Sequence, residues 1–592
     1  MTHLIKFRLP FSLLSYFSTS SPTPTPPPSK LYSRRNVDFL LKKVPSLVTI
    51  PDSIDNSTIS QLLSSAESFV NEHHSQEKHL DVEVPVYNSV TKSVVMSPRV
   101  KPILDAYREA GFSSMGEGGL DLPYVIQCAI GSITGSGFTS GVLGHFVLTQ
   151  CAANLLLKHG SKELIRKFHA PLVEGVYTGT MALSETQAGS SLQAITTKAR
   201  LSEGIGAGVY KLTGGKMWTS GADHDGLSDN IIHMLLAKVE GSDKISLFLV
   251  PKFLEDGSRN DYEIGGVNHK MGSRGLSNCY WNLEGATGYL VGEVDKGLNC
   301  MIFMMNEMRI HVGLGASICG VRGFQESLAY ACERKQGKAG EIINYPDVKR
   351  QLLAQKVYSE GALGLVFWGA ALNDSEDKDD LELLDLLTPV IKAWPSEWTL
   401  EANKWAIQVL GGYGYTSDFP LEQVYRDNRL NMIHEGANGI HALTLLGRNV
   451  MQNNGNSMKI LLTRMSKAAA ECNDVEIQGA MLQAVGILKD VTTAIGAKIV
   501  GGEVDVGMAN AHEYLNMFGH TVIAYVWLEQ MKAAEKMLGE GGELSEDERN
   551  FYLGKVVAGE FFFKHELVKI RGQAKLLLSF DTGVLKMENS FF

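Results

Sequence analysis

Glycine-rich and histidine-rich stretches are the first residues whose types could bind a nucleotide or a metal. GSITGSG (131–137) and GIGAG (204–208) contain small residues suited to close backbone approach. Neither matches G-x-G-x-x-G, and neither lies at the strand-to-helix turn that this motif needs. NEHHSQEKH (71–79) has no matching cysteine or histidine cluster elsewhere in the chain. We therefore interpret it as the polar end of a surface helix and predict no metal site.

Two other stretches are more specific. The first is MALSETQAGSSLQAITTKA (181–199), followed by KMWTSGA (216–222), and the second is QVLGGYGYTSDFPLEQVYRDNRLNMIHEG (408–436). With these signatures in this order, residues from about 100 to 446 resemble the acyl-CoA dehydrogenase family. The resemblance implies FAD as the cofactor and an acyl-CoA thioester as the substrate. It also implies α,β-desaturation to a trans-2-enoyl-CoA, with hydride transfer to flavin N5, as in fatty acid metabolism.

The first signature carries the residues that the resemblance places against the flavin ring. These are Leu183, Ser184, Trp218 and Ser220, and Ser190 is expected near the thioester end of the substrate. A tryptophan offers a flat apolar wall, and hydroxyl groups can tune the electronics of the ring. Without the surrounding motif, Trp218 would be interpreted as a core aromatic.

A second group of residues matches family positions that bind the rest of the cofactor. Arg334, in YACERKQGK (330–338), corresponds to an arginine that contacts the FAD pyrophosphate across a dimer, a role that suits a bidentate guanidinium. Gln408, Gly411 and Gly412 match the segment that meets the adenosine half of the neighbouring FAD. The resemblance therefore implies a homodimer. Alternatively, Arg334 is a solvated charge at a helix end, and the segment with Gln408, Gly411 and Gly412 is a simple helix–loop junction.

The catalytic base is implied by IHEG (433–436). In the family, the glutamate at the position of Glu435 removes the α-proton, and burial makes a carboxylate a better base. Some members instead carry the base immediately before an arginine on another helix. In MMNEMRI (304–310) that position is Met308, while Glu307 lies one residue away and is expected to point elsewhere. Arg309 is expected on the substrate side.

Several positions depart from the family signatures. Thr186 and Gln187 replace a common Pro-Gly, and Ser191 replaces an aspartate. Ala437 replaces a threonine and Gly439 a glutamine, at positions that often contact FAD. These changes leave open whether FAD binding is weakened.

The elements that must position these residues change character along the chain. VLGHFVLTQCAANLLL (142–157) predicts a buried helix, whereas 231–239 and 244–252 predict strands. YKLTGGKMWTS (210–220) predicts a hairpin that turns at its two glycines. Helical spacing returns in 347–372, and also in Met481, Val485, Leu488, Ile495 and Ile499. The order predicts an α+β multidomain fold.

The expected domains follow these changes of pattern. They are a leader and linker (1–30), an N-terminal helical domain (31–177), a central β-barrel-like domain (178–296), a helical bundle with Glu435 (297–449) and an additional helical domain (450–592). The family fold has the same order of helices, β-domain and helical bundle. The last segment resembles long-form members, a group that includes 3-methylmercaptopropionyl-CoA dehydrogenase.

Composition narrows the class of protein. The chain has 592 residues, of which 44% are hydrophobic and 20% charged, as in globular proteins of several domains. A net charge of −10 argues against a nucleic-acid partner. Seven scattered cysteines without CxxC spacing indicate a reducing compartment. No apolar run is long enough for a transmembrane segment.

The N-terminal residues resemble a targeting signal. The first 37 residues contain no Asp or Glu, and PTPTPPP (22–28) forms an extended linker. This pattern predicts a transit peptide and a location in the mitochondrial matrix. A disordered tail without targeting function is the alternative.

Three functions remain open at this point. The first is a dehydrogenase that passes electrons to an electron-transferring flavoprotein. The second is an acyl-CoA oxidase, against which the C-terminal MENSFF argues because it is not a peroxisomal tripeptide. The third is a non-catalytic, binding or DNA-associated member, which the net charge and Glu435 disfavour.

Overall fold

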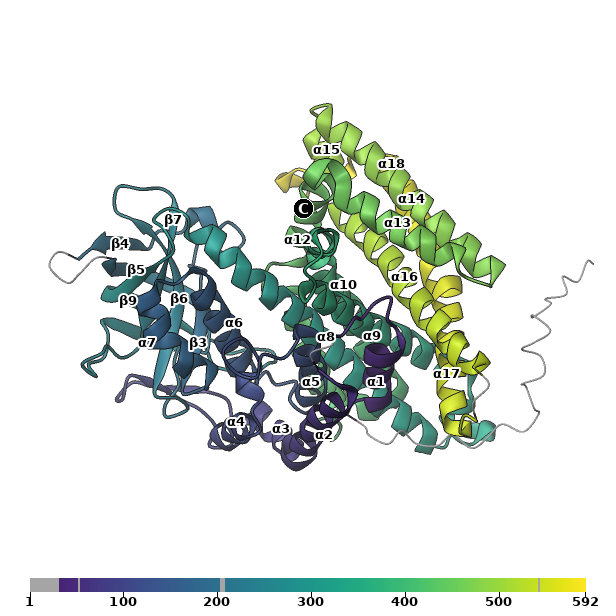
Figure 1. Cartoon of the computed structure of the whole chain (residues 1–592), viewed down its shortest axis with the longest axis horizontal. Helices are drawn as coiled ribbons and strands as arrows, with labels where there is room; N and C mark the ends of the chain where they lie inside the picture. Colours follow the sequence, from purple (N-terminus) through teal and green to yellow (C-terminus); the bar gives the residue numbers. More distant parts are fainter. Residues whose placement is uncertain (1–30, 52–53, 203–207, 541–542) are drawn as a thin grey trace, which may run out of the picture.

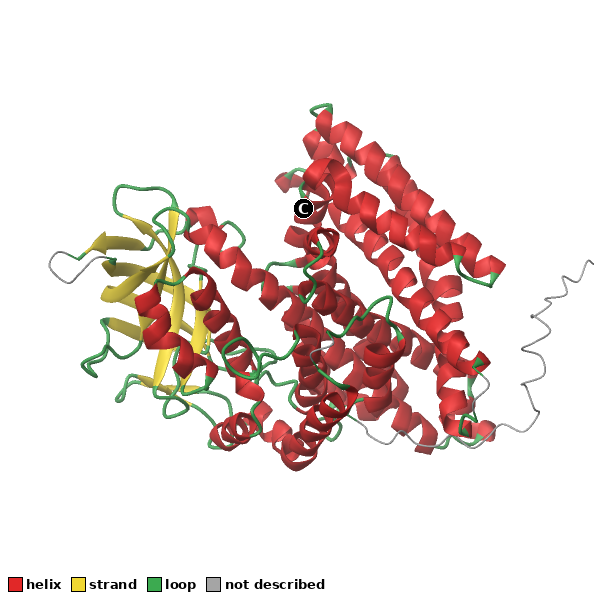
Figure 2. Ribbon diagram, viewed as in Figure 1, coloured by secondary structure: helices red, strands yellow, loops and turns green. Residues whose placement is uncertain are grey.

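The computed structural model describes residues 31–51, 54–202, 208–540 and 543–592. Helices and strands are segregated along the chain: the strands gather at one end of the molecule, and helical bundles form the rest (Figures 1 and 2). The expected α+β multidomain fold is confirmed. The predicted leader and the proline linker lie outside the described residues.

Helices dominate the segment before the main sheet. They are α1 (Arg34–Lys43), α2 (Asn56–His73), α3 (Glu77–Val82), α4 (Val100–Glu109), α5 (Tyr124–Thr134), α6 (Gly144–His159) and α7 (Lys162–Val173). Helix α6 confirms the buried helix predicted at 142–157 and begins at its glycine. The short antiparallel pair β1 (Val86–Asn88) and β2 (Ser93–Val95) was not predicted. This pair contacts the segment after β5, because the amide of Val94 donates to the Asp223 carboxylate at 2.8 Å.

Seven strands form the central sheet. They are β3 (Tyr177–Ala182), β4 (Lys198–Leu201), β5 (Val209–Ser220), β6 (Asn230–Val239), β7 (Ile245–Pro251), β8 (Tyr262–Val267) and β9 (Asn278–Val291). The strand order is β3-β6-β4-β5-β9-β7, and β8 pairs with β9. An additional pairing of β6 with β7 closes the path into a barrel-like ring, as expected. Strands β6 and β7 confirm the two predicted runs.

The hairpin predicted at the two glycines of 210–220 is wrong. Gly214 and Gly215 lie inside β5, a single strand that pairs antiparallel with β9. A Cβ on Gly214 would lie 2.6 Å from the Thr197 hydroxyl oxygen, and the φ of Gly214 is +149°. The glycine therefore permits a close approach of neighbouring chain and does not make a turn.

Long helices follow the sheet. They are α8 (Gly297–Glu333), α9 (Pro346–Asn373), α10 (Lys378–Leu410), α11 (Leu421–Arg429) and α12 (Asn438–Gly447). Helix α9 confirms the helix predicted at 347–372. Helices α8, α9 and α10 pack against one another, and α6 packs against α8, which joins the first helical region to the bundle.

The last segment adds α13 (Asn456–Ala470), α14 (Val475–Val500), α15 (Val504–Met508), α16 (Ala511–Gly539), α17 (Glu546–Phe561) and α18 (Ile570–Leu578). On α14 the predicted apolar face is buried at Met481, Val485, Leu488 and Ile495. Helix α16 packs on α9, α10 and α12, so this segment supports the bundle from outside. Among the described residues, no helix has the length and apolarity needed to cross a bilayer.

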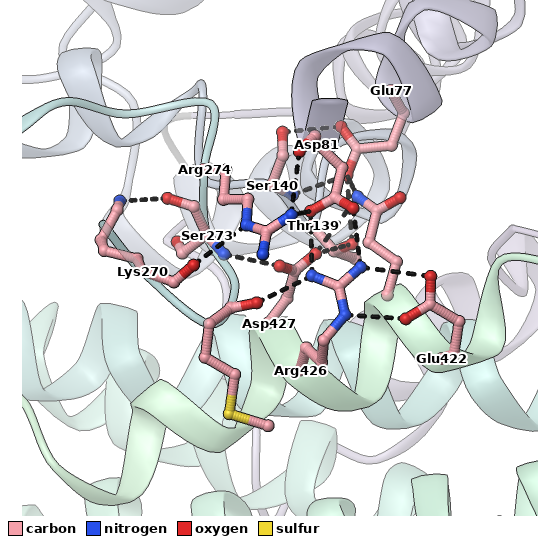
Figure 3. A network of polar contacts seen from close by, with 12 residues as sticks. Glu77, Asp81, Thr139, Ser140, Lys270, Ser273, Arg274, Glu422, Arg426 and Asp427 are labelled. Carbon is pink, nitrogen blue, oxygen red and sulfur yellow. Dashed lines mark hydrogen bonds and ion pairs between the residues drawn. The ribbon is translucent and has the colours of Figure 1, made fainter. Parts of the chain in front are cut away.

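A buried polar network joins α3, the loop before β9 and α11 (Figure 3). Asp427 accepts a hydrogen bond from the amide of Ser273 at 2.6 Å and from the Thr139 hydroxyl at 2.9 Å. Glu77 accepts from the amide of Ser140 at 2.6 Å. Glu77 belongs to the stretch that we interpreted as a surface helix end, yet its side chain is buried, and these donors compensate part of its desolvation. The network fixes α11 against the β-domain loop.

Candidate active site

Glu435 lies in the short loop between α11 and α12. Its backbone has φ +55°, a left-handed conformation that costs a non-glycine residue about 1–2 kcal/mol. The carbonyl oxygen of Glu435 accepts a hydrogen bond from Nε2 of His441 at 3.0 Å. Burial lowers the pKa of His441 to about 3, with further lowering by Arg309 and Lys392, so this imidazole is neutral and Nε2 carries its proton. The strained backbone of Glu435 is therefore held from α12.

The surroundings of Glu435 shift its proton affinity. Burial raises the pKa of its carboxyl, and the positive charges of Arg309 and Lys392 lower it in part, which leaves it at about 7. Arg309 comes from α8 and donates from Nη1 to Asn306 Oδ1 at 2.9 Å. Its Nε has no partner among the described residues. A half-buried carboxyl with a pKa near neutrality is suited to accept a proton.

Lys392 is a residue of the site that sequence analysis missed. Its side chain is completely buried in α10, and Nζ donates to the Gly436 carbonyl oxygen at 2.7 Å and to Asn438 Oδ1 at 3.0 Å. Burial lowers its pKa to about 7, although Glu435 acts in the opposite direction. A lone lysine inside the apolar run LLTPVIKAWP (386–395) was the signal that could have revealed it.

Glu307 lies on the same helix as Arg309 but is tied to α6. Its Oε1 accepts a hydrogen bond from Asn154 Nδ2 at 3.0 Å, and burial raises its pKa to about 7. The Cys151 thiol contacts Glu307 and lies within electrostatic range of Glu435 as well. The Glu307 and Glu435 carboxyls therefore lie near each other, whereas the sequence analysis expected Glu307 to point elsewhere. Met308, at the alternative base position, is buried.

The residues expected at the flavin ring form one wall. The amide of Met217 donates to the Ser184 carbonyl oxygen at 2.9 Å, which joins the 183–184 segment to β5. Asn278 Nδ2 donates to the Trp218 carbonyl oxygen and to Ser220 Oγ, both at 3.0 Å. Trp218 has φ +63° and a 59% exposed side chain, while Leu183 packs at the edge of an apolar cluster. This strained, exposed tryptophan presents a flat apolar face.

A buried ion pair supports this wall. Lys216 Nζ lies 2.9 Å from Glu185 Oε1, and both side chains are almost fully buried. Nζ also donates to the Leu183 carbonyl oxygen at 3.2 Å. Glu185 additionally accepts from the amide and hydroxyl groups of Thr196 and Thr197. Burial raises the pKa of Glu185, but Lys216 and these donors lower it by more, which leaves the pKa at about 2. The pair is therefore ionised.

A separate cavity of about 510 Å³ lies at the C-terminal ends of α8 and α10. Arg334, Gly411 and Gly412 line it, together with Tyr413, whose ring lies 5.7 Å from the Arg334 guanidinium carbon. Gly411 has φ +60°, and a Cβ on either glycine would meet nothing within 4 Å. The structure thus brings together three of the four residues expected at the far half of FAD. Gln408 is exposed one turn earlier.

The residues present fit the two halves of FAD. The Trp218 wall, with the Ser184 and Ser220 hydroxyls, suits the flavin ring, and the glycine-lined cavity with its arginine suits a pyrophosphate. Ser190 is exposed on the loop after Glu185, and no contact with the wall places it at the thioester. Gly439, where a glutamine is common in the family, faces open space.

Comparisons with known proteins agree with this geometry. Three sequence models match the chain: the acyl-CoA dehydrogenase middle domain (180–286), the acyl-CoA dehydrogenase C-terminal domain (295–451) and the acetyl-CoA dehydrogenase C-terminal-like domain (461–588). The broad-specificity linear acyl-CoA dehydrogenase of Mycobacterium tuberculosis is 28% identical over 86% of this chain and 90% of that protein. The 3-methylmercaptopropionyl-CoA dehydrogenase of Ruegeria pomeroyi is 29% identical over 83% and 87%.

Solved structures share the fold. An acyl-CoA dehydrogenase of Bacillus anthracis, complexed with FAD, has a TM-score of 0.74 at 21% identity and covers 93% of both chains. ACDH-11 of Caenorhabditis elegans, in complex with C11-CoA, has a TM-score of 0.78 at 17% identity, over 98% of this chain and 100% of that one. The chain belongs to the acyl-CoA dehydrogenase family of flavin-dependent oxidoreductases.

Proposed function

We propose that this protein desaturates an acyl-CoA thioester between its α and β carbons, with Glu435 as the base. The observation that carries this assignment is the Glu435 carboxyl itself, whose pKa burial raises to about 7 in a loop flanked by Arg309 and Lys392. At pH 8 it is mostly ionised and can accept the α-proton. FAD, when bound, supplies the acceptor for the β-hydride.

The chain's own residues divide the remaining work. His441 holds the loop of the base through the Glu435 carbonyl. We assign the Trp218 wall, with Leu183, Ser184 and Ser220, to positioning of the flavin ring, because it is flat, exposed and anchored by Asn278. Arg309 and Ser190 remain our candidates for contacts with the substrate.

We propose that the active form is a homodimer in which Arg334, Gln408, Gly411 and Gly412 serve the FAD of the partner. Arg309 lies on helix α8, and Arg334 follows immediately after the end of the same helix. Twenty-five residues at about 1.5 Å rise per residue separate them by about 37 Å. This span exceeds the length of one extended dinucleotide, which supports two FAD molecules meeting different ends of one chain. Sedimentation of the holoprotein tests this, and a monomer with full FAD occupancy would contradict it.

The substrate class is proposed from the relatives. Three relatives that match more than three quarters of this chain have names that specify linear acyl-CoA, 3-methylmercaptopropionyl-CoA and butyryl-CoA, all unbranched acyl groups. We therefore propose a straight-chain acyl-CoA and an electron-transferring flavoprotein as acceptor. The test is to purify the protein, record its flavin spectrum and add a panel of straight and branched acyl-CoAs without oxygen. Bleaching by straight-chain members supports the proposal, and a flavin that no acyl-CoA bleaches refutes it.

The cellular location is a separate proposal. The acid-free, basic N-terminal stretch supports import into mitochondria. Sequencing the N-terminus of protein from its native source tests this, because an intact Met1 or Thr2 would exclude a cleaved transit peptide.

A further inference from the structure

Lys392 differs from the other buried lysines of the described chain. Four lysines are buried, and three of them form ion pairs: Lys216 with Glu185 at 2.9 Å, Lys252 with Asp223 at 2.7 Å and Lys555 with Glu360 at 2.7 Å. Lys392 has no carboxylate within 4 Å among the described residues. A buried ammonium without a paired anion is costly, so its position calls for another reason than fold stability.

Its contacts identify that reason. The Lys392 ammonium reaches 44 residues along the chain to the Gly436 carbonyl, and it also binds the Asn438 side chain at the start of α12. His441 holds the neighbouring carbonyl, that of Glu435. Two successive carbonyls of the left-handed turn at the base are thus fixed from α10 and α12. Without such contacts, the turn would relax toward an unstrained conformation.

In its protonated form, Lys392 has a second effect on the base, and its pKa of about 7 confines this form mainly to neutral and lower pH. Arg309 from α8 and Lys392 from α10 are the cations that face Glu435. Among the other titratable groups nearby, His441 and His434 are neutral because burial lowers their pKa to about 3, and Cys151 is neutral because burial raises its pKa. Glu307 on α8 also lies nearby, with a pKa that burial raises to about 7. Glu397 on α10 also acts on Lys392. Removal of the Lys392 charge therefore leaves Arg309 alone to favour the carboxylate.

We propose that Lys392 is a positioning residue for the base: its side-chain nitrogen holds the Glu435–Asn438 turn in place and, when protonated, favours the ionised form of Glu435. This inference rests on the proposed role of Glu435 and adds a residue that acts through it. Lys392 itself is fully buried and contacts the loop at Gly436 and Asn438.

Two substitutions separate the two effects. Lys392→Gln keeps a hydrogen-bond donor for the turn but removes the charge, and Lys392→Met removes both. Lys555→Gln is the matched control, since it also removes a buried ammonium, while Glu360 keeps Lys356 at 2.6 Å. The first measurement is the pH dependence of flavin reduction by a good acyl-CoA in the holoenzyme. The second is infrared titration of the Glu435 carboxyl without substrate, assigned by its loss in Glu435→Gln.

Both Lys392 variants are expected to raise the pKa of Glu435, by less than about 1 unit, because the facing group that is lost is only partly protonated near pH 7. At pH values above that pKa, Lys392→Gln should reduce flavin near the wild-type rate. Lys392→Met should be slower by about 10-fold or more, because the base is displaced. Lys555→Gln should change neither quantity.

One outcome of these measurements would contradict the proposal. If both Lys392 variants keep the wild-type carboxyl pKa and plateau rate, and lose only thermal stability as Lys555→Gln does, the proposal is wrong. If no acyl-CoA reduces wild-type flavin, the proposed function fails instead. In that case, the infrared titration still shows whether Lys392 sets the proton affinity of Glu435.

Discussion

The Oε1 atom of Glu307 accepts a hydrogen bond from Nδ2 of Asn154 at 3.0 Å, which ties this carboxyl to α6. Glu435, in contrast, lies on a loop whose backbone is held by His441 and Lys392. Both carboxyls have a pKa raised to about 7 by burial. Proton affinity alone therefore does not select the base, and the positions of the two groups must decide.

Glu435→Gln is expected to abolish dehydrogenation. Glutamine keeps the size of the side chain but cannot accept the α-proton, and loss of a general base typically costs about 10²–10⁴ in rate. FAD content and acyl-CoA binding should stay close to wild type. Glu307→Gln should retain most activity, because its amide can still bond Asn154. Single-turnover flavin reduction compares the three proteins, and a dead Glu307→Gln with an active Glu435→Gln would reverse the assignment.

Trp218→Ala is expected to weaken FAD binding by about 10-fold or more, equivalent to roughly 1.4 kcal/mol, because a flat apolar contact is removed. Trp218→Phe should retain most of the affinity. Tyr280→Ala is the control, since Tyr280 is an exposed aromatic on β9 in the same sheet. Fluorescence titration of the apoprotein with FAD measures the dissociation constants. Equal affinities in Trp218→Ala and wild type would show that the wall does not hold the ring.

Lys216→Met is expected to lower the free energy of unfolding by about 3–5 kcal/mol, because it leaves the Glu185 carboxylate buried without its cation. The 183–184 segment should loosen, and FAD should be retained less well. Arg200→Met breaks an exposed pair with Glu240 in the same sheet and should cost about 1 kcal/mol or less. Urea unfolding measures both. A similar cost for the two variants would mean that the buried pair does not support the wall.

The polar network around Glu77 and Asp427 predicts a pH-dependent stability. Burial first, and then mutual repulsion with a neighbouring carboxylate, raises the pKa of Glu77 from 4.5 to about 7; burial mainly raises that of Asp427 from 3.8 to about 6. The folded state then binds more protons than the unfolded state between about pH 4 and 7, so these groups make the protein less stable as the pH rises through that range.

Glu77→Gln should reduce this loss. The variant removes one titrating group and the repulsion on Asp427, so its melting temperature should fall less between pH 5 and pH 8 than that of wild type. Glu163→Gln, at an exposed helix position, should leave the wild-type difference unchanged. Thermal unfolding at both pH values measures it. A Glu77→Gln variant with the wild-type difference would show that this network does not control stability.

Local patterns in the sequence identified several individual elements. Helical spacing identified α9 and α14, because burial of one face repeats with the period of the helix. A long apolar run identified most of α6. Signatures pointed to Glu435, Trp218 and Arg334. The structure places Glu435 in a strained turn, Trp218 on an exposed wall and Arg334 at the edge of a cavity. The hairpin at Gly214 failed because the need for glycine there comes from Thr197, on another segment.

The sequence by itself determined the order of helices and strands, the apolar faces and the family signatures, because these depend on residue types at short spacing. Only the tertiary structure decided which charges meet. Lys392 reaches Gly436 across 44 residues, and Gln423 contacts Glu77 across 346. Such contacts follow from helix packing rather than from local propensity, and burial in that packing moves the pKa values of Glu435 and Lys392 toward 7.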